Sequence, residues 1–216
     1  MKTELRRQLD FLRVYLITDR TLLPGERFLM GIEAALRGGV RSLQLREKDL
    51  SPAELLSLAR QVKTITRRYG AKLFVNDRAD IAEMAGAEGV HLTKTSVPVA
   101  AVKKLFPRLL AGVSTHSLES AQKAEAEGAD FITFSPIFDT PSKRQYGPPQ
   151  GLDRLREVTG KTGIPVLALG GIKADTIRPV LAQGACGVAL ISDIWNSDDI
   201  EKTSYQYLRH FTGDSL

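Results

Sequence analysis

The sequence predicts an α/β protein built as a single (β/α)8 TIM barrel, and three observations support this fold class. The chain has 216 residues, 43% hydrophobic and 25% charged, which suits one large α/β domain. Eight short β-branched or aliphatic runs alternate with helical patterns. Glycines recur at the junctions between a helix and the next strand. Eight such units, with no GxGxxG after the first strand, favour a closed barrel over an open doubly wound sheet.

The predicted strands are mostly apolar on both faces, which is typical of buried parallel strands. We expect a short N-terminal helix at 1–13, a barrel core at 14–194, and a last helix and tail at 195–216, all within one domain covering 1–216. The strands are expected at 14–18, 42–46, 72–76, 89–92, 110–114, 131–134, 165–169 and 187–191.

The predicted helices lie between these strands, and the clearest helix start is Ser51-Pro52-Ala53-Glu54. Ser51 is the candidate N-cap, Pro52 suits the first helical position, and Glu54 would complete a capping box. The helices are expected at 28–37, 51–68, 80–84, 99–105, 117–127, 151–162, 174–182 and 199–210. Glycines that suit left-handed caps follow several of them, at Gly38-Gly39, Gly70, Gly86, Gly128 and Gly184.

Composition and charge indicate which kinds of molecule the protein binds. The chain carries 30 Lys+Arg against 25 Asp+Glu, a net charge of +5, without a basic block or interleaved aromatics, so no nucleic-acid partner is expected. No apolar run approaches the roughly 18–20 residues of a membrane span, so no membrane partner is expected. The charged N-terminal segment does not predict a secretory signal, and the single Cys186 fits a reducing cytoplasm. We expect a cytoplasmic protein that acts on small anionic molecules, with homo-oligomer formation left open.

Active sites of (β/α)8 barrels lie at the carboxyl ends of the strands. Here those ends are rich in cations and hydroxyl groups, and they contain neither a Cys/His nucleophile pair nor a histidine cluster. This composition predicts a rim that holds anions, phosphates in particular. Its polar residues include Asp19, Arg20, Gln44, Arg46, Glu47, Lys48, Asn76, Asp77, Arg78, Lys94, Ser96, Ser114, His116 and Ser192.

Two stretches of this rim predict ligand contacts. Gly170-Gly171-Ile172 and Ile191-Ser192 follow the last two strands, where barrels often bind a phosphate; the alternative for the glycines is a simple tight turn. In Gln44-x-Arg46-x-Lys48 the three polar side chains share one side of an extended segment. That side should face the barrel lumen and mouth, because the helix layer is apolar. The alternative is a structural ion pair between Arg46 and Glu47.

Asn76-Asp77 is a candidate metal site. A carboxylate beside phosphate-binding cations suits Mg²⁺, which takes few protein carboxylates and completes its shell with substrate oxygens and water. The alternatives are that Asp77 caps the next helix or pairs with Arg78. Among the histidines, His91 is interpreted as a satisfied lumen residue. His116 is the better rim candidate for a general base, although Ser117 could make it part of a capping turn.

These strand-end residues resemble those of the thiamine phosphate synthase family and of its relative, the TenI-type thiazole tautomerase. The resemblance runs from about residue 14 to residue 194, and it is specific because the stretches occur in order at matching strand ends. They are Tyr15-Leu-Ile-Thr-Asp19, Gln44-Leu-Arg-Glu-Lys48, Val75-Asn-Asp-Arg78, Gly89-Val-His-Leu92, Gly112-Val-Ser-Thr-His116, Phe134-Ser-Pro-Ile-Phe138, Thr140-Pro-Ser-Lys143, Gly170-Gly-Ile172 and Ile191-Ser192.

The resemblance implies a (β/α)8 transferase that joins two thiamine precursors. Hydroxymethylpyrimidine diphosphate would lose pyrophosphate to leave a carbocation, which the nitrogen of a thiazole phosphate then captures. The implied catalytic residues are Arg46, Lys48, Ser114 and Lys143. By position, the resemblance places Gln44 on the pyrimidine; Arg46, Lys48, Asn76 and Lys143 on the pyrophosphate; Ser114 at the reacting end; Thr140 and Ser142 on the thiazole substrate; Gly171, Ile191 and Ser192 at its phosphate; and Asp77 on Mg²⁺.

One stretch departs from the synthase pattern. Where the family has a second carboxylate ligand for magnesium, this chain has Thr93-Lys94-Thr95-Ser96, so Ser96 replaces it. The tautomerase is the alternative; it needs neither pyrimidine nor Mg²⁺, and it carries a catalytic histidine where this chain has Pro136. A third alternative is a phosphate-binding barrel without turnover. The retained Gln44, Arg46 and Lys48, together with the rest of the pyrophosphate set, favour the synthase.

Overall fold

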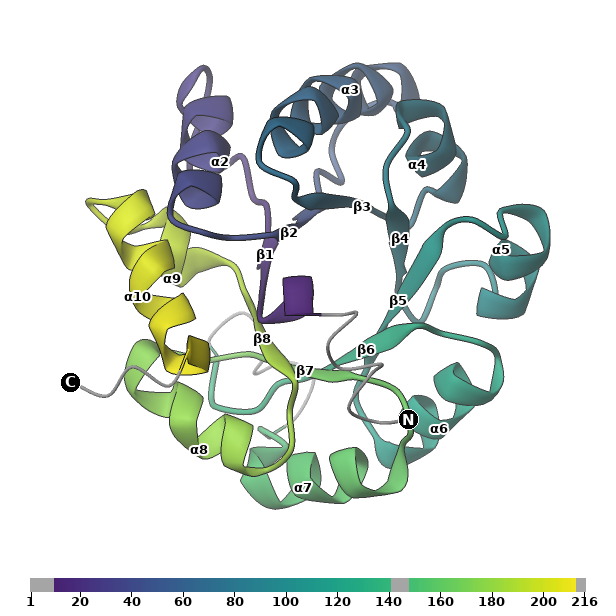
Figure 1. Ribbon diagram of the computed structural model, residues 1–216. Coiled ribbons are helices and arrows are strands. Elements are labelled where there is room, and N and C mark those ends of the chain that lie inside the picture. The colour runs from purple at the N-terminus through teal and green to yellow at the C-terminus, as the bar shows by residue number, and fades with distance from the viewer. Residues whose placement is uncertain (1–9, 141–147, 213–216) are drawn as a thin grey trace.

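A computed structural model describes residues 10–140 and 148–212. Eight parallel strands form a closed barrel in sequence order, with helices around the outside (Figure 1). The predicted fold is confirmed, and each predicted strand boundary lies within one residue of the observed one. The strands are β1 Val14–Ile17, β2 Ser42–Leu45, β3 Lys72–Asn76, β4 Gly89–Leu92, β5 Leu110–Thr115, β6 Phe131–Phe134, β7 Val166–Leu169 and β8 Gly187–Leu190.

The helix following each of the strands β1 to β7 packs on the outside of the barrel. The helices are α2 Arg27–Arg37, α3 Pro52–Arg68, α4 Ala79–Ala85, α5 Val99–Leu105, α6 Leu118–Ala126, α7 Gly151–Lys161, α8 Ile177–Ala182, α9 Ser192–Trp195 and α10 Ile200–Thr212, with 3-10 helices η1 Asp10–Leu12 and η3 Ala174–Thr176. The predicted capping box is present: the Ser51 hydroxyl accepts from the Glu54 backbone N–H, and the Glu54 carboxylate accepts from the Ser51 N–H at 2.9 Å.

The observed helices differ from the predicted ones in three places. The segment predicted as one helix over 174–182 divides into η3 and α8. The short helix α9, which directly follows β8, was not predicted, and it straddles the boundary expected between 194 and 195. Of the expected N-terminal helix, the described residues form only the single turn η1, and residues 1–9 lie outside the described part of the chain.

Side chains alternate between two cores along each strand. Residues such as Leu16, Leu43 and Val75 pack against the helices, whereas Tyr15 and Phe74 fill the barrel lumen. The lumen is aromatic in its middle layer, because Phe131 makes edge-on contacts with both of these rings at centroid distances of 5.3–5.5 Å. The predicted apolar character of both strand faces therefore has a simple basis: one face is the helix layer and the other is the lumen.

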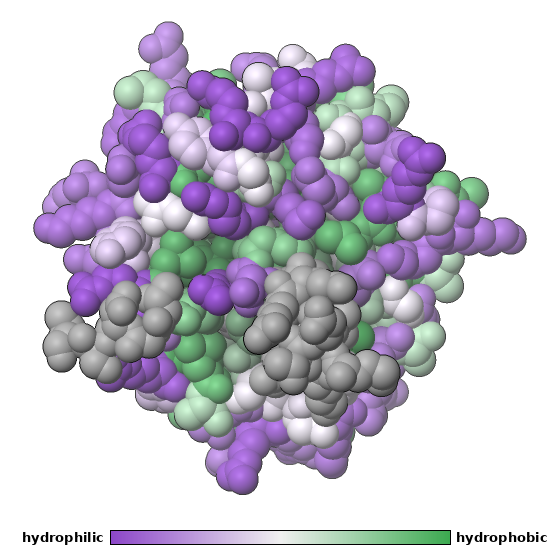
Figure 2. Space-filling view, in the orientation of Figure 1, coloured by the Kyte–Doolittle hydropathy of each residue, from purple (hydrophilic) through white to green (hydrophobic). Residues whose placement is uncertain are grey.

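The end of the barrel at which the strands begin is closed by η1. Phe11 stacks on Phe74, the Lys72 ammonium lies 4.9 Å from the Phe11 ring centre, and Leu12 is fully buried in the lumen cluster. Figure 2, in the same orientation as Figure 1, shows apolar side chains toward the centre of this face and hydrophilic ones around its edge. Ligand access therefore falls to the opposite end, where the strands finish.

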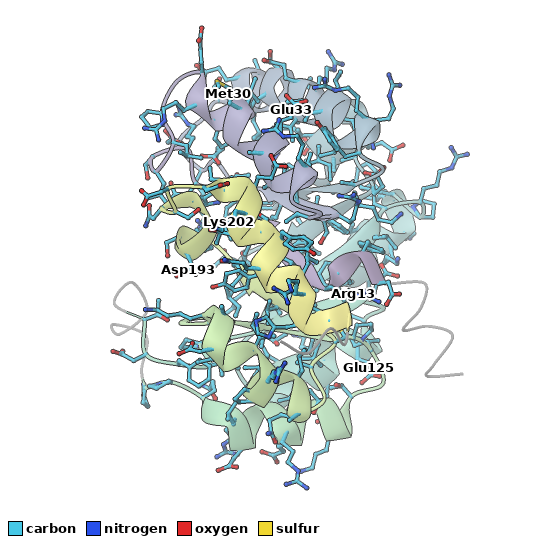
Figure 3. The ribbon with its side chains drawn as sticks, turned by 60° about the vertical axis from the view of Figure 1, so that its left-hand side comes forward. Arg13, Met30, Glu33, Glu125, Asp193 and Lys202 are labelled. Atoms are coloured by element: carbon cyan, nitrogen blue, oxygen red, sulfur yellow. The ribbon has the colours of Figure 1, made fainter. Side chains whose placement is uncertain are left out.

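The C-terminal helix α10 packs outside the barrel beside α2 and α8 (Figure 3). An ion pair joins the Arg37 Nε of α2 to the Glu201 carboxylate of α10 at 2.7 Å, and the Tyr207 hydroxyl bonds to Asp193 of α9. Within the described residues, none of the helices has both the length and the apolar character that crossing a membrane requires.

Candidate active site at the carboxyl ends of the strands

A series of hydrogen-bonded polar side chains, most of them buried, lies at the base of the barrel mouth. Gln44 is 2% exposed, and its Nε2 donates to the Tyr15 hydroxyl at 3.3 Å. That hydroxyl lies 3.2 Å from the His91 Nδ1, and the His91 Nε2 lies 3.0 Å from the Ser114 Oγ. The prediction that Gln44 faces the lumen is confirmed, and the interpretation of His91 as a satisfied lumen residue agrees with these contacts.

His91 is a neutral imidazole. Burial lowers its pKa to about 3, and the nearby charge of Arg46 acts in the same direction. The described residues provide no carboxylate contact to this ring. The buried polar residues beneath the mouth therefore carry no charge. They provide no negative charge to neutralise the Arg46 guanidinium.

The two cations of β2 lie just beyond the end of the strand. Arg46 is half-buried and Lys48 is exposed. Neither side chain has a hydrogen bond or ion pair with another described residue. Cations held at the mouth without a protein partner fit the predicted role of binding an anion.

Glu47 explains how the segment between these cations is held. Its carboxylate accepts from the Thr18 hydroxyl at 2.5 Å and from the Arg20 backbone N–H at 3.1 Å. The Thr18 hydroxyl in turn accepts from the Arg46 backbone N–H at 3.0 Å. Burial raises the pKa of this carboxyl, with the hydrogen bond from Thr18 opposing the shift. The alternative of an Arg46–Glu47 ion pair is wrong, because the Glu47 carboxylate binds Thr18 and Arg20 and makes no ion pair with Arg46.

Asp77 has an unusual backbone conformation at the end of β3. Its φ is +65°, and among the described residues other than glycine it alone has a positive φ. Its N–H donates to the His91 carbonyl at 2.9 Å, and the Arg78 N–H donates to the Asn76 carbonyl at 2.8 Å. The Asp77 carboxylate is exposed at the rim beside half-buried Asn76.

Both alternatives for Asp77 fail. The N-cap of α4 is Arg78, which makes no side-chain capping bond. Arg78 instead pairs with Asp80, at 2.6 and 2.9 Å. The described residues contain no group of three or more His, Cys, Asp or Glu that could hold a metal. One exposed carboxylate fits Mg²⁺ if phosphate oxygens and water complete the shell, as this ion commonly requires.

The segment that departs from the family pattern forms a compact turn after β4. The Ser96 hydroxyl accepts from the Thr93 backbone N–H at 2.7 Å and lies 3.1 Å from the Thr93 hydroxyl. Lys94 is exposed at the tip of this turn. The Ser96 hydroxyl thus bonds within its own turn, and Lys94 adds a positive charge to the same turn.

The ends of β7 and β8 have the backbone that close approach of a ligand requires. Gly170 and Gly171 have φ of +102° and +66°, and a Cβ on Gly171 would lie 2.8 Å from the Phe138 Cβ. This left-handed backbone is compatible both with the predicted phosphate contact and with the alternative of a simple tight turn. Ile191 is half-buried and directly precedes α9, whose first residue, Ser192, is exposed. The first backbone N–H groups of a helix have no partner within it, which suits an anion.

The loop after β6 lies only partly within the described residues. The Thr140 hydroxyl donates to the Phe138 carbonyl at 3.1 Å. Ser142 and Lys143 lie outside the described residues. His116, the candidate general base, is exposed at the end of β5; its Nδ1 lies 2.8 Å from the Ser135 carbonyl, and its backbone N–H donates to the Ser120 hydroxyl. It is part of the α6 capping turn that the sequence offered as its alternative role.

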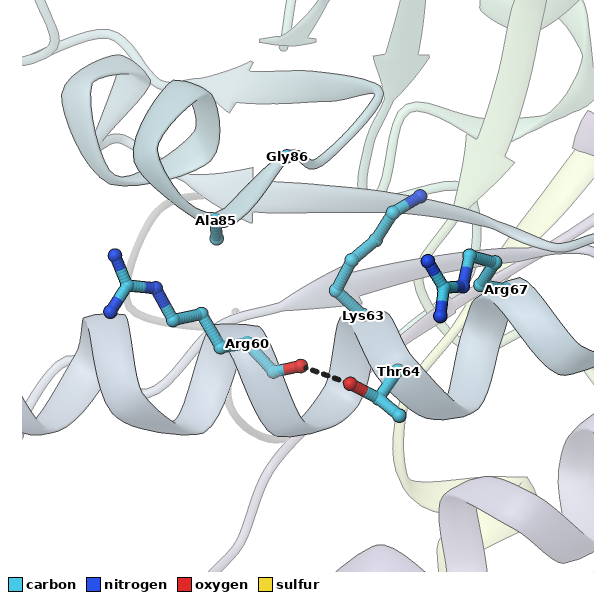
Figure 4. Close-up of a pocket in the computed structure, with 6 residues that line it drawn as sticks. All are labelled: Arg60, Lys63, Thr64, Arg67, Ala85 and Gly86. Atoms are coloured by element: carbon cyan, nitrogen blue, oxygen red, sulfur yellow. Dashed lines mark hydrogen bonds between the residues drawn. The ribbon is translucent and has the colours of Figure 1, made fainter.

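A hollow lies on the outside of the barrel between α3 and α4 (Figure 4). Both helices run toward the end at which the strands begin, so this hollow is remote from the strand ends. The Lys63 ammonium pairs with Glu88, and the other cations lie near the carboxyl end of α4, whose dipole they complement. The hollow is lined by Arg60, Lys63, Thr64, Arg67, Ala85 and Gly86.

Sequence reasoning missed the residues that support the site from within. Tyr15 lies in the lumen and joins Gln44 to His91, while Thr18 and Glu47 brace the Arg46 backbone. The signal for Tyr15 was its period-two spacing from Ile17, since both lie on the lumen face of β1. The Thr18–Glu47 contact links the segments that follow β1 and β2, so no local sequence pattern could have revealed it.

A family model, similar sequences and a solved structure point to the same family. A model of the family described as thiamine monophosphate synthase matches residues 14–194. A putative thiamine-phosphate synthase of Geobacter sulfurreducens is 52% identical over 87% of this chain and 88% of its own. The thiamine-phosphate synthase of Pyrococcus horikoshii is 35% identical over 89% of this chain and 91% of its own. The solved thiamine phosphate pyrophosphorylase of Pyrococcus furiosus superposes with a TM-score of 0.86 at 34% identity, covering 93% of this chain and 95% of its own.

Proposed function

The chain belongs to the thiamine monophosphate synthase family of transferases, and from this premise we propose that it joins hydroxymethylpyrimidine diphosphate to a thiazole phosphate, releasing pyrophosphate. The bond between the pyrimidine methylene carbon and the diphosphate oxygen breaks, and the oxygen keeps the electron pair. The thiazole nitrogen then bonds to that carbon. No protein nucleophile takes part, so the enzyme accelerates the reaction by stabilising charge.

The observation that carries this proposal is the free positive charge at the mouth. Arg46 has no partner among the described residues, while the neighbouring Glu47 is bound to Thr18 and Arg20. A leaving pyrophosphate gains negative charge as the bond breaks, so cations already placed there stabilise the transition state more than the ground state. In this role we place the cations Arg46 and Lys48, together with Lys143 of the loop after β6, and we place the neutral Asn76 amide as a further hydrogen-bond donor to the pyrophosphate.

The pyrimidine would sit over the polar floor of the lumen. We place Gln44 on the pyrimidine ring and Ser114 at the reacting methylene end, since both side chains lie at the carboxyl end of the lumen. The thiazole substrate would approach from the other half of the mouth, with Thr140 and Ser142 on its ring. Its phosphate would bind at Gly171, Ile191 and Ser192, where left-handed glycine backbone and the start of α9 offer N–H groups.

Mg²⁺ would neutralise diphosphate charge when bound, with Asp77 as its protein carboxylate. Ser96 stands where the family pattern has a second carboxylate, so we expect weaker metal binding than two carboxylates would give. Lys94 places a cation in the same turn and would offset part of that loss. We further expect the enzyme to work in the cytoplasm on phosphorylated small molecules.

The test is product formation from both precursors. Purified protein is incubated with the pyrimidine diphosphate, the thiazole phosphate and Mg²⁺, and thiamine phosphate is measured by chromatography. The proposal expects product that requires all three components. Isomerisation of a thiazole carboxylate phosphate without pyrimidine or metal would indicate the tautomerase instead. Tight binding of either precursor without turnover would indicate a phosphate-binding barrel.

A further inference from the structure

We propose that Tyr15 and His91 are positioning residues that direct the hydroxyl proton of Ser114 into the barrel mouth. They connect Gln44 to Ser114 through three successive hydrogen bonds of 3.3, 3.2 and 3.0 Å. Tyr15, Gln44 and His91 are all buried, so water does not compete for these contacts. The consequence for turnover rests on the proposed function, whereas the direction of the hydrogen bonds does not.

The direction follows from the donor at one end. The Gln44 Nε2 is an amide nitrogen that can donate a hydrogen bond but not accept one, so the Tyr15 oxygen is the acceptor in that contact. The Tyr15 O–H must then donate to another acceptor. The His91 Nδ1, at 3.2 Å, is the remaining polar partner that the described residues give this hydroxyl. The Nδ1 is therefore an acceptor and carries no proton.

A neutral imidazole has one N–H, so the proton of His91 lies on Nε2. This N–H points to the Ser114 Oγ at 3.0 Å; the Thr133 Oγ1 is farther away, at 3.5 Å. Ser114 thus accepts from inside the barrel. Its own O–H is left to donate outward, toward whatever anion occupies the mouth.

Packing holds the imidazole in this orientation. Its ring lies between Tyr15 and Phe131, with ring-centre distances of 5.5 and 5.9 Å. Gly112 leaves the space for it, since a Cβ at that position would lie 2.7 Å from the His91 Nδ1. A ring packed this way cannot turn over to offer the other nitrogen to Ser114 without moving its neighbours.

The hydrogen-bonded series Gln44–Tyr15–His91–Ser114, here called the relay, therefore presents opposite hydrogen-bonding groups at its two ends. Gln44 presents its amide oxygen, an acceptor, and Ser114 presents a donor. For the proposed reaction, a hydroxyl already directed at the departing oxygen supplies its hydrogen bond without first reorienting. Such a contact strengthens as charge develops, so its loss should lower kcat more than it changes KM.

The direct test is the tautomer of His91, measured by two-dimensional long-range ¹⁵N–¹H NMR on protein with labelled histidines. His116→Gln and His210→Gln variants assign the three histidine signals. The proposal expects the proton of His91 on Nε2 in the wild type. A proton on Nδ1 would overturn the proposal, whatever the activity of the protein.

Tyr15→Phe removes one hydroxyl, and Thr133→Val is its matched control, another buried hydroxyl that contacts the same imidazole more weakly. In Tyr15→Phe, we expect the His91 signal to show a mixture of tautomers and kcat to fall about 10-fold, with KM changing less than about 2-fold. In Thr133→Val we expect the tautomer and kcat to stay near those of the wild type.

A double-mutant cycle then links the relay to Ser114. If Tyr15 acts through Ser114, Tyr15→Phe should lower kcat little further in a Ser114→Ala background. Independent, multiplicative losses would overturn the positioning role. A wild type that makes no thiamine phosphate would reject the proposed function, while the NMR result would still decide the orientation of the relay.

Discussion

Asp77 combines a strained backbone with an exposed carboxylate. A positive φ is uncommon outside glycine, and where it persists at a strand end it often accompanies a functional role. Here the strain is maintained by hydrogen bonds on both sides of the residue, from the Asp77 N–H to His91 and from the Arg78 N–H to Asn76. The turn directs the carboxylate outward at the rim instead of into the cap of α4.

Asp77→Gly separates the metal role from the fold. Glycine accepts the observed φ without strain but loses more chain entropy on folding, so we expect the free energy of unfolding to change by less than about 1 kcal/mol. Turnover should fall strongly, and added Mg²⁺ should not restore it fully. Urea unfolding and product formation against Mg²⁺ concentration check both parts. Wild-type magnesium dependence in Asp77→Gly would remove this residue from the metal site.

Ser96→Asp should restore a carboxylate to the rim without disturbing the turn. An aspartate can accept from the Thr93 N–H as the Ser96 hydroxyl does at 2.7 Å. A second carboxylate attracts a hard cation, so half-maximal activity should need less Mg²⁺. Lys94 would partly neutralise the new charge, and the double change with Lys94→Gln should therefore shift the curve further. Three superimposable curves would show that this turn does not face the metal.

At the scale of the element, glycines in β4 and β5 give the lumen its aromatic layer. A Cβ on Gly112 would lie 2.4 Å from the Phe131 ring and 2.7 Å from His91. A Cβ on Gly89 would lie 2.5 Å from the Phe74 ring. These strands therefore contribute empty space on their lumen faces, and the large rings of β3 and β6 fill it.

Gly112→Ala should lower the free energy of unfolding by about 1–3 kcal/mol, because a packed lumen cannot absorb the methyl group. Gly160→Ala in α7 is the control, since nothing lies within 4 Å of its added Cβ. There the substitution should stabilise the protein by about 0.5–1 kcal/mol through helix propensity. Urea unfolding of the two variants measures both values. A neutral Gly112→Ala would mean that the lumen is loosely packed.

The elements were predictable from the sequence where a local pattern determines them. The strands are apolar runs between helix-to-strand glycines, and α3 has a complete capping box, so both were placed closely. The helix α9 was not predictable, because its four residues are too few to show a period. The lumen position of Gln44 followed from strand alternation. The partner of Glu47 could not be predicted in this way, because Thr18 follows β1 and only the pairing of β1 with β2 brings the two residues together.

At the scale of the whole molecule, buried and paired groups predict a loss of stability in acid. The folded state keeps His91 neutral down to a pKa of about 3 instead of 6.5, so the unfolded state binds more protons in that window. Stability therefore falls as the pH drops through it. Asp80 and Glu157 act in the same direction, because Arg78 and Lys161 lower their carboxyl pKa values. Their contribution is lost only as the pH falls below their ordinary values.

Glu47 acts in the opposite direction. Burial raises its pKa above 4.5, so its contribution is largest below that value and is lost as the pH rises. We therefore expect the free energy of unfolding to fall most steeply below about pH 4.5, where Glu47 no longer offsets His91. Urea unfolding at several pH values measures the slope. His91→Gln should flatten it between pH 6.5 and 3, and an unchanged slope would contradict this account.

The closure of the barrel by β1 and β8 has a consequence for folding order. Every other pair of neighbouring strands is joined by a local segment, but Leu16 meets Leu190 only when the two ends of the chain come together. Bringing the two ends together costs the conformational entropy of the whole intervening chain. We therefore expect this β1–β8 contact, the seam of the barrel, to form after the rate-limiting step of folding.

Leu190→Ala should then mainly accelerate unfolding, whereas Leu43→Ala in β2 should also slow folding. Stopped-flow folding and unfolding rates against urea would show this difference, and equal effects on the two rates would place seam closure earlier. The seam would thus govern how long a finished barrel persists, and the first strands how quickly one is made.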